Sequence, residues 1–259
     1  MTAPEMTPRD DNVDKELPLF DHLVELRNRL LHSVLAVLVA FLPLYAFRNE
    51  IYAYMAKPLR AAMPEGATMI ATEVASPFLA PFKLTMVLAI FLMIPFILYQ
   101  IWSFIAPALY KHEKKLAIPL LVSSVLLFYL GVAFAYYVVF PLAFNFFASA
   151  SPEGVTVMTD INKYLDFILK LFFAFGFAFE IPIATVLMVK VGITNVASLR
   201  EKRPYIVVIC FIIGMLLTPP DVISQTLLAV PMWLLFEVGV LCSRWVEPTA
   251  DSNSESINT

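Results

Sequence analysis

Long apolar runs, separated by short polar segments, dominate the chain. A helix needs about 20 apolar residues to cross a bilayer core of about 30 Å. Four runs have about this length or more, at residues 30–47, 84–106, 116–140 and 164–189. Two shorter runs follow at residues 204–217 and 225–242, with only the segment TPPDVIS between them. Pro219 and Pro220 prevent a continuous helix there. The pattern therefore predicts six helices, the last two of which are short and form a tight hairpin.

The short final pair allows two topologies. A re-entrant hairpin would return to its own side of the membrane, whereas two spanning helices would require a thinned bilayer or a low position within it. We favour two spans, because Arg244 and the basic segment from Arg200 to Arg203 then flank the same side. The mismatch costs only fractions of a kcal/mol per Å.

The basic residues indicate the orientation of these spans. With the N-terminus in the cytoplasm, most lysines and arginines lie on the cytoplasmic side, as the positive-inside rule requires. Both termini are then cytoplasmic. The outer segment of residues 48–83 contains the amphipathic stretch IYAYMAKPLRAAM and is expected to cap the outer mouth of the bundle. Residues 1–18 and 245–259 are expected to be disordered tails that flank one transmembrane domain of residues 19–244.

Prolines recur within or at the edges of the expected spans, at Pro43, Pro95, Pro119, Pro182 and Pro231. Each removes a backbone hydrogen bond and is expected to bend its helix. The expected fold class is therefore an all-α integral membrane protein, with six transmembrane helices in a curved bundle that has a concave wall.

The composition supports this fold class and excludes several functions. With 60% hydrophobic and 15% charged residues, the chain lies outside the range of soluble globular proteins. The net charge of -3 and the lack of a long basic stripe argue against a nucleic-acid partner. No phosphate-binding loop, HExxH motif or Cys/His cluster with metal-ligand spacing is present, so we expect no cofactor, no metal and no enzymatic activity. Cys210 and Cys242 are expected to be unpaired thiols.

Two charged patches stand out, LFDHLVELRNRL at residues 19–30 and FIAPALYKHEKK at residues 104–115. The plain interpretation is an interfacial helix, in which Glu25 pairs with Arg29 one turn away, followed by a solvated positive-inside loop. The alternative is a recognition surface. Glu25 and Glu113, close to aromatic residues such as Phe104, would then bind a basic peptide through carboxylate–guanidinium hydrogen bonds.

Glu180 is a third outlier, because it lies deep within the apolar run FFAFGFAFEIPIATVL. A carboxylate at the centre of a span costs about 2.5 to 3.5 kcal/mol on insertion scales. We therefore expect Glu180 to face the bundle interior or water rather than lipid. One alternative is a protonated or hydrogen-bonded Glu180 that stabilises helix packing. The other is that Glu180 provides a polar group within the concave wall.

Several segments together resemble the TatC family, the multispanning core subunit of the twin-arginine protein translocase. They are HLVELRNRLL, ATEVASPF, FIAPALYKHEKK, LREKRPY and GMLLTPPDVISQTLLAVPM. The resemblance runs from about Leu17 to Arg244. It implies a glove-like bundle of six helices in the bacterial inner membrane that binds twin-arginine signal peptides of folded precursors. It also implies assembly with single-span TatA- and TatB-type subunits, self-association in a receptor complex, and transport driven by the proton-motive force.

The resemblance also implies roles for particular residues. The signal-peptide site would comprise Glu25, Arg27, Phe104 and Glu113, and Glu180 would be the polar group within the concave face. Pro58 and the turn formed by Pro219, Pro220 and Asp221 match further positions that family members use. Partner helices would dock along the final pair at Met215, Thr218 and Gln225.

Two other function classes are compatible with the physical pattern. An ion-coupled secondary transporter would use Glu180 as its carrier group, and a structural scaffold would tolerate replacement of all three glutamates. The lack of an inverted repeat and the charged patches argue against both.

Overall fold

The structure, a computed structural model, describes residues 13–57, 69–109, 117–149, 158–218 and 222–245. These segments are mainly helical. An isolated parallel β-bridge joins Ile70 and Asp160. The elements are α1 (Val13–Ala46), α2 (Arg48–Met55), α4 (Ser76–Leu92), α5 (Ile94–Leu109), α6 (Ala117–Phe134), the π-helix η2 (Ala135–Val139), α7 (Phe140–Ser149), α8 (Ile161–Ala178), α9 (Ile181–Lys190), α10 (Val196–Glu201), α11 (Arg203–Leu217) and α12 (Val222–Ser243).

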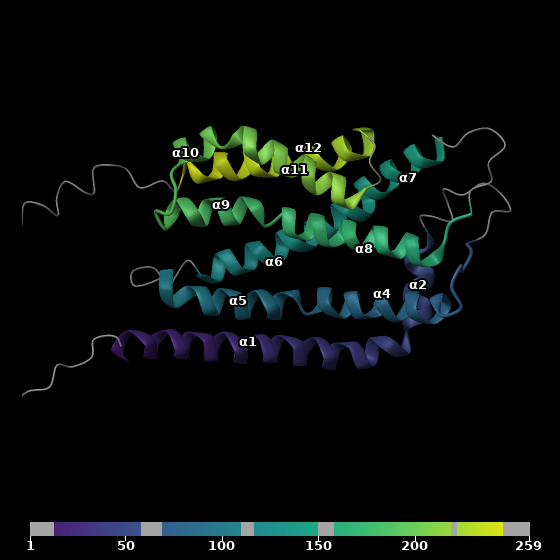
Figure 1. Cartoon of the computed structure of the whole chain (residues 1–259), viewed down its shortest axis with the longest axis horizontal. Coiled ribbons are helices and arrows are strands. Elements are labelled where there is room, and N and C mark those ends of the chain that lie inside the picture. Colours follow the sequence, from purple (N-terminus) through teal and green to yellow (C-terminus); the bar gives the residue numbers. More distant parts are fainter. Residues whose placement is uncertain (1–12, 58–68, 110–116, 150–157, 219–221, 246–259) are drawn as a thin grey trace, which may run out of the picture.

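The helices run side by side along one long axis (Figure 1). α1 begins and α12 ends at the same end, which we call the N-terminal end of the bundle. α2 lies at the opposite end, which we call the far end. α1 packs against α4 and α5, α6 against α8, and both α9 and α11 against α12.

The core is aromatic and is centred on α8, whose Tyr164, Leu165, Ile168 and Phe175 are almost fully buried. Two small residues allow α6 and α8 to approach each other. A Cβ atom at Gly131 would lie 2.4 Å from the carbonyl oxygen of Phe175, and one at Gly176 would meet the ring of Phe128. The contact between α6 and α8 is thus set by glycine on both helices.

The membrane-spanning capacity agrees with the expected fold class. Within the described residues, four helices are long and apolar enough to cross a bilayer, and α4 with the first part of α5 forms a fifth span if this bent pair is counted as one. α11 is apolar but has only 15 residues, about 22 Å of helix. The predicted six-span topology therefore depends on α11.

The prediction of a short final pair holds for α11 and is wrong for α12. α12 has 22 residues, because it already begins at Val222, three residues before the predicted start at Gln225, and Pro231 does not interrupt it. At about 33 Å, α12 is long enough to cross the bilayer unaided. Of these two final helices, only α11 is much shorter than the hydrocarbon core of the bilayer.

Several predicted boundaries shift along the chain. α1 begins at Val13, so the boundary expected at residue 18 falls inside this helix. α4 begins at Ser76 rather than at Leu84, because Pro77 takes a position in its first turn, where no backbone N–H is required. The outer cap is correspondingly shorter than residues 48–83. Pro58 lies outside the described residues.

The prolines do not all act alike. The bend expected near Pro95 is present, since the axes of α4 and α5 differ by 51° across a break at Met93. Pro182 follows the break between α8 and α9. Pro119 sits in the first turn of α6, whereas Pro43 and Pro231 lie inside α1 and α12 without interrupting either helix.

Two long-range contacts tie the far end together. The Tyr164 hydroxyl donates a hydrogen bond to the Met55 carbonyl, 2.7 Å away. The Ile70 N–H donates to the carbonyl oxygen of Thr159, just before α8, and the Ile70 carbonyl accepts from the N–H of Ile161, the first residue of α8. α2 and the strand-like residues near Ile70 are thereby held against the start of α8.

Candidate functional site

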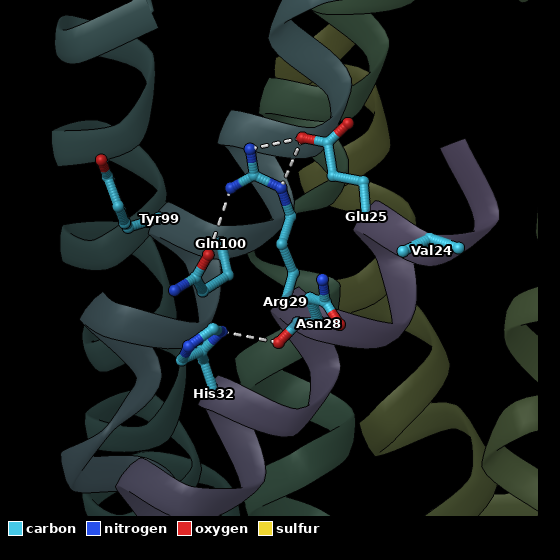
Figure 2. A pocket seen from close by; sticks show the side chains of 7 residues that line it. All are labelled: Val24, Glu25, Asn28, Arg29, His32, Tyr99 and Gln100. Atoms are coloured by element: carbon cyan, nitrogen blue, oxygen red, sulfur yellow. Dashed lines mark hydrogen bonds and ion pairs between the residues drawn. The ribbon is translucent and has the colours of Figure 1, made fainter. Parts of the chain in front are cut away.

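A groove between α1 and α5 at the N-terminal end of the bundle contains the first predicted site residue, Glu25. Its volume is about 570 Å³. The residues that line this α1–α5 groove are Val24, Glu25, Asn28, Arg29, His32, Tyr99 and Gln100 (Figure 2). Five come from successive turns of α1, and two come from the middle of α5.

The centre of the groove is a carboxylate–guanidinium pair. Oε1 of Glu25 accepts hydrogen bonds from Nη2 and Nε of Arg29, at 2.6 and 2.9 Å. The third guanidinium nitrogen, Nη1, donates to Oε1 of Gln100 on α5, at 3.2 Å (Figure 2). Arg29 therefore links the carboxylate on α1 to the amide on α5. The expected pairing of Glu25 with Arg29 is present, and it extends across two helices.

Two polar side chains at and beside the groove bond to the backbone of α1. Nδ1 of His32 lies 2.7 Å from the backbone carbonyl oxygen of Asn28, and the Ser33 hydroxyl donates to the carbonyl oxygen of Arg29. These bonds use backbone acceptors of α1 one turn back. They hold the side chains close to the helix and leave the groove open above them.

The other residues predicted for this site are only partly accounted for. Arg27 is exposed on α1 and donates through Nε and Nη2 to Oδ1 of Asn28, and it does not line the groove. Phe104 is half-buried on α5, one turn beyond Gln100. Glu113 lies outside the described residues. Of the predicted residues, the structure therefore brings Glu25 to the groove.

Sequence reasoning missed Gln100 and Tyr99. Both lie in the apolar run of residues 84–106, and Gln100 is a polar residue without an evident partner along the chain. The signal that could have singled out Gln100 is the cost of placing an amide within a span without a hydrogen-bond partner. Its actual partner, Arg29, lies 71 positions away.

Glu180 occupies the break between α8 and α9. Its backbone N–H bonds to the carbonyl oxygen of Phe177, and its own carbonyl accepts from Ala184. The carboxyl group interacts with the buried hydroxyl of Ser124 on α6, and Oε1 is buried without a hydrogen-bond partner among the described residues. Glu180 thus points into the bundle, toward α6.

The predicted docking residues lie near the hairpin between α11 and α12. Met215 is half-exposed on α11, whereas the Thr218 hydroxyl is buried and donates to the carbonyl oxygen of Gly214. Gln225 on α12 donates through Nε2 to the carbonyl oxygen of Phe211. Gln225 therefore links α12 to α11, whereas the Thr218 bond lies within the last turn of α11. Pro219, Pro220 and Asp221 lie outside the described residues.

Comparison with known proteins identifies the family. Residues 21–231 match the family described as "Sec-independent protein translocase protein (TatC)". The chain belongs to the TatC family. A TatC protein of Azotobacter chroococcum mcd 1 is 66% identical over 235 residues, which cover 91% of this chain and 92% of that relative. A TatC protein of Haemophilus influenzae is 60% identical over 247 residues, which cover 95% and 96%.

A solved TatC structure shares the fold. The crystal structure described as "Twin Arginine Translocase Receptor- TatC" superimposes with a TM-score of 0.79 at 37% identity, covering 87% of this chain and 99% of that one. The TatC relatives are named as protein translocase components and not as enzymes. Together with the apolar helices, TatC membership makes the chain a multi-pass membrane protein.

Proposed function

We propose that this TatC chain is the receptor for twin-arginine signal peptides and the core of the translocase, and that the α1–α5 groove receives the arginines. The observation that carries the proposal is the geometry at Glu25. Its carboxylate already holds a guanidinium group through two hydrogen bonds to one oxygen. A second guanidinium, supplied by a peptide, has the same chemistry and could exchange with that of Arg29.

Exchange costs little free energy because both states keep the carboxylate paired. A hydrogen bond to a charged group contributes about 1.5 to 3 kcal/mol. The Arg29 and Glu25 side chains are 25% and 38% exposed, so the lower part of that range applies. Release of Arg29 from Glu25 still leaves its bond to Gln100. The Arg29 guanidinium, which is partly exposed, would thus keep one hydrogen bond while the carboxylate pairs with the peptide.

The second arginine would be bound by Glu113, in the segment between α5 and α6. This part of the proposal rests on the sequence pattern and on family membership. Half-buried Phe104 on α5 would contact the apolar residues that follow the two arginines. The rest of the signal peptide would extend along the bundle wall toward Glu180, whose buried oxygen without a partner among the described residues would be a polar contact inside the membrane.

The translocase would be completed by single-span TatA- and TatB-type subunits and by further copies of this chain. Their helices would dock near Met215, Thr218 and Gln225, beside the short helix α11. The N-terminal end of the bundle would face the cytoplasm of a bacterial inner membrane, with six spans and both termini on that side. Pro58 and the TPPD turn would face the outer side, and the proton-motive force would drive transport.

Site-specific photocrosslinking tests the proposal. A photoreactive residue at Tyr99, which lines the groove, is exposed to a precursor with an Arg-Arg signal and to the same precursor with Lys-Lys. A probe at Tyr54, an exposed residue of α2 at the far end, is the matched control. Crosslinking at Tyr99 that weakens with Lys-Lys supports the receptor. Equal crosslinking at both probes, or none at Tyr99 in correctly inserted protein, would contradict it.

A further inference from the structure

A second cavity, unrelated to the α1–α5 groove, lies between α9 and α11 toward the N-terminal end of the bundle. Its volume is about 600 Å³, within the range of small-molecule sites. α9 and α11 both pack on α12 but diverge from each other, and Figure 1 shows the three helices side by side. Buried Met232 and Phe236 of α12 form the floor of this α9–α11 groove.

The walls of the α9–α11 groove are predominantly apolar. One wall comes from α8 and α9, the other from α11, and the side chains involved are Phe177, Ile181, Ala184, Met188, Ile206, Ile209 and Ile213. Phe177, Ile209 and Ile213 remain 59%, 49% and 38% exposed, so the groove opens sideways toward the surrounding membrane. Its occupant must therefore be apolar and must enter from the lipid.

Apart from Cys210 and Thr185, whose hydroxyl donates to backbone carbonyls of α9, the polar groups of the lining gather at one end. Lys202, at the start of α11, lines the groove and is exposed. The Thr194 hydroxyl lines the same end, is buried, and has no hydrogen-bond partner among the described residues. A buried hydroxyl without a partner is unfavourable, and a ligand oxygen would satisfy it. One cation and one free donor together fit an anionic oxygen group such as a phosphate.

The length of the groove indicates the kind of occupant. Lys202 and Ile213 are 11 positions apart on α11, which corresponds to about 16 Å. This is close to half of a hydrocarbon core of about 30 Å, the depth of one leaflet. A partner helix that spans the membrane would extend well beyond it. Met215, Thr218 and Gln225, the residues proposed for helix docking, do not line this groove.

We propose that the α9–α11 groove binds one anionic glycerophospholipid, with an acyl chain along α11 and the phosphate at Lys202 and Thr194. The nearby charges support this choice. Arg200 and Lys190 add positive potential near this end of the groove. Arg203 is neutralised by Glu237, at 2.5 Å. Glu201 is the other acidic residue on this turn. Basic pockets between helices at the membrane surface are typical sites for anionic lipid headgroups.

Native mass spectrometry of the full chain in neutral detergent tests this proposal. The probes are phosphatidylglycerol and phosphatidylcholine with identical acyl chains, and glycerol 3-phosphate as the headgroup without chains. We expect one phosphatidylglycerol to be retained, at concentrations where phosphatidylcholine and glycerol 3-phosphate are lost. Lys202→Gln should lower its retention about tenfold, the effect of losing one charge pair worth about 1.4 kcal/mol. Thr194→Val should lower it less.

Two further variants separate this site from general surface charge. Arg200→Gln removes a cation from the same turn that does not line the groove, so it should lower retention much less than Lys202→Gln. Ala184→Phe fills the groove and should abolish retention, whatever the headgroup. Equal retention of both lipids, an equal effect of Arg200→Gln and Lys202→Gln, or full retention in Ala184→Phe would overturn the proposal. Because Lys202 and Thr194 are not in the packed core, their variants remain informative if Ala184→Phe fails to fold.

Discussion

Asp160 and Thr72 join the start of α8 to a segment that lies far away in the sequence. Oδ2 of Asp160 accepts hydrogen bonds from the hydroxyl and the backbone N–H of Thr72, at 2.7 and 3.0 Å. Oδ1 caps α8 by accepting from the N–H groups of Asn162 and Lys163. These donors, the Thr72 hydroxyl foremost, lower the pKa of Asp160 to about 2. One ionised carboxylate thus stabilises a helix start and a long-range contact.

This contact should make the stability of the far end depend on pH. Because the pKa of Asp160 is lower in the folded protein than the value of about 3.9 in an unfolded chain, its contribution is fully present above about pH 4. It is lost as the pH falls through about 2. Asp160→Asn should therefore melt below the wild type at pH 7, and the difference should shrink toward pH 2. Thermal unfolding in detergent, followed by circular dichroism, measures this difference.

Thr72→Val provides the matching control, because it removes the hydroxyl donor and keeps the volume of the side chain. It should reproduce part of the effect with the same pH dependence. A difference between the wild type and Asp160→Asn that stays constant from pH 7 to pH 2 would contradict the assigned role.

Glu25→Gln should weaken the binding of an Arg-Arg signal peptide. Loss of the carboxylate charge at this partly exposed site removes an interaction worth about 1.5 kcal/mol, or roughly 10-fold in Kd. Fluorescence titration of a labelled signal peptide into the reconstituted chain gives this value. Glu50→Gln, on exposed α2 at the far end, is a control with the same change in charge and should bind normally. Unchanged affinity in Glu25→Gln would exclude Glu25 as an arginine ligand.

Gly131→Ala should strongly destabilise the bundle. The new Cβ would lie 2.4 Å from the carbonyl oxygen of Phe175, a backbone atom that cannot rotate away, so α6 and α8 must separate. Overpacking of this kind costs about 1 to 3 kcal/mol or more. Leu130→Ala, at a neighbouring side chain that is 57% exposed, should have little effect. Similar melting temperatures for the two variants would show that this crossing tolerates a larger separation.

Glu237→Gln should loosen the attachment of α11 to α12. Oε2 of Glu237 lies 2.5 Å from Nη2 of Arg203, and the Glu237 side chain is only 19% exposed. The expected loss is about 1 kcal/mol, typical of a partly exposed ion pair. Equilibrium unfolding with a double-mutant cycle against Arg203→Gln isolates the pair. Exposed Glu201→Gln should be neutral, and a coupling energy near zero in the cycle would count against the pair.

The sequence was most informative where a property belongs to a single helix. The apolar runs predicted the spans, the position of Pro95 predicted a bend that is present, and the spacing of Glu25 and Arg29 predicted their pairing. Each follows from helical geometry within one segment. The start of α4 at Ser76 was missed, because a polar stretch with prolines looks like a loop until its packing against α1 is known.

Properties that depend on two segments could not be derived in the same way. Gln100 belongs to the α1–α5 groove only because α5 packs against α1, and no periodicity encodes that contact. The divergence of α9 and α11 over α12 also has no local signature. The predicted α12 is too short, because Pro219 and Pro220 indicate a helix break without indicating where the next helix begins. That helix begins at Val222.

The 51° break at Met93 has a geometric consequence for the distant end of α5. Gln100 lies seven residues beyond the break, about 10.5 Å along the axis. If α4 and α5 formed a straight rod, Gln100 would be displaced by about 9 Å, and the bond to Arg29 could not form. A change in the angle at Met93, by ligand, lipid or mutation, would therefore move Gln100 relative to Arg29 and change the width of the α1–α5 groove from a distant point in the bundle.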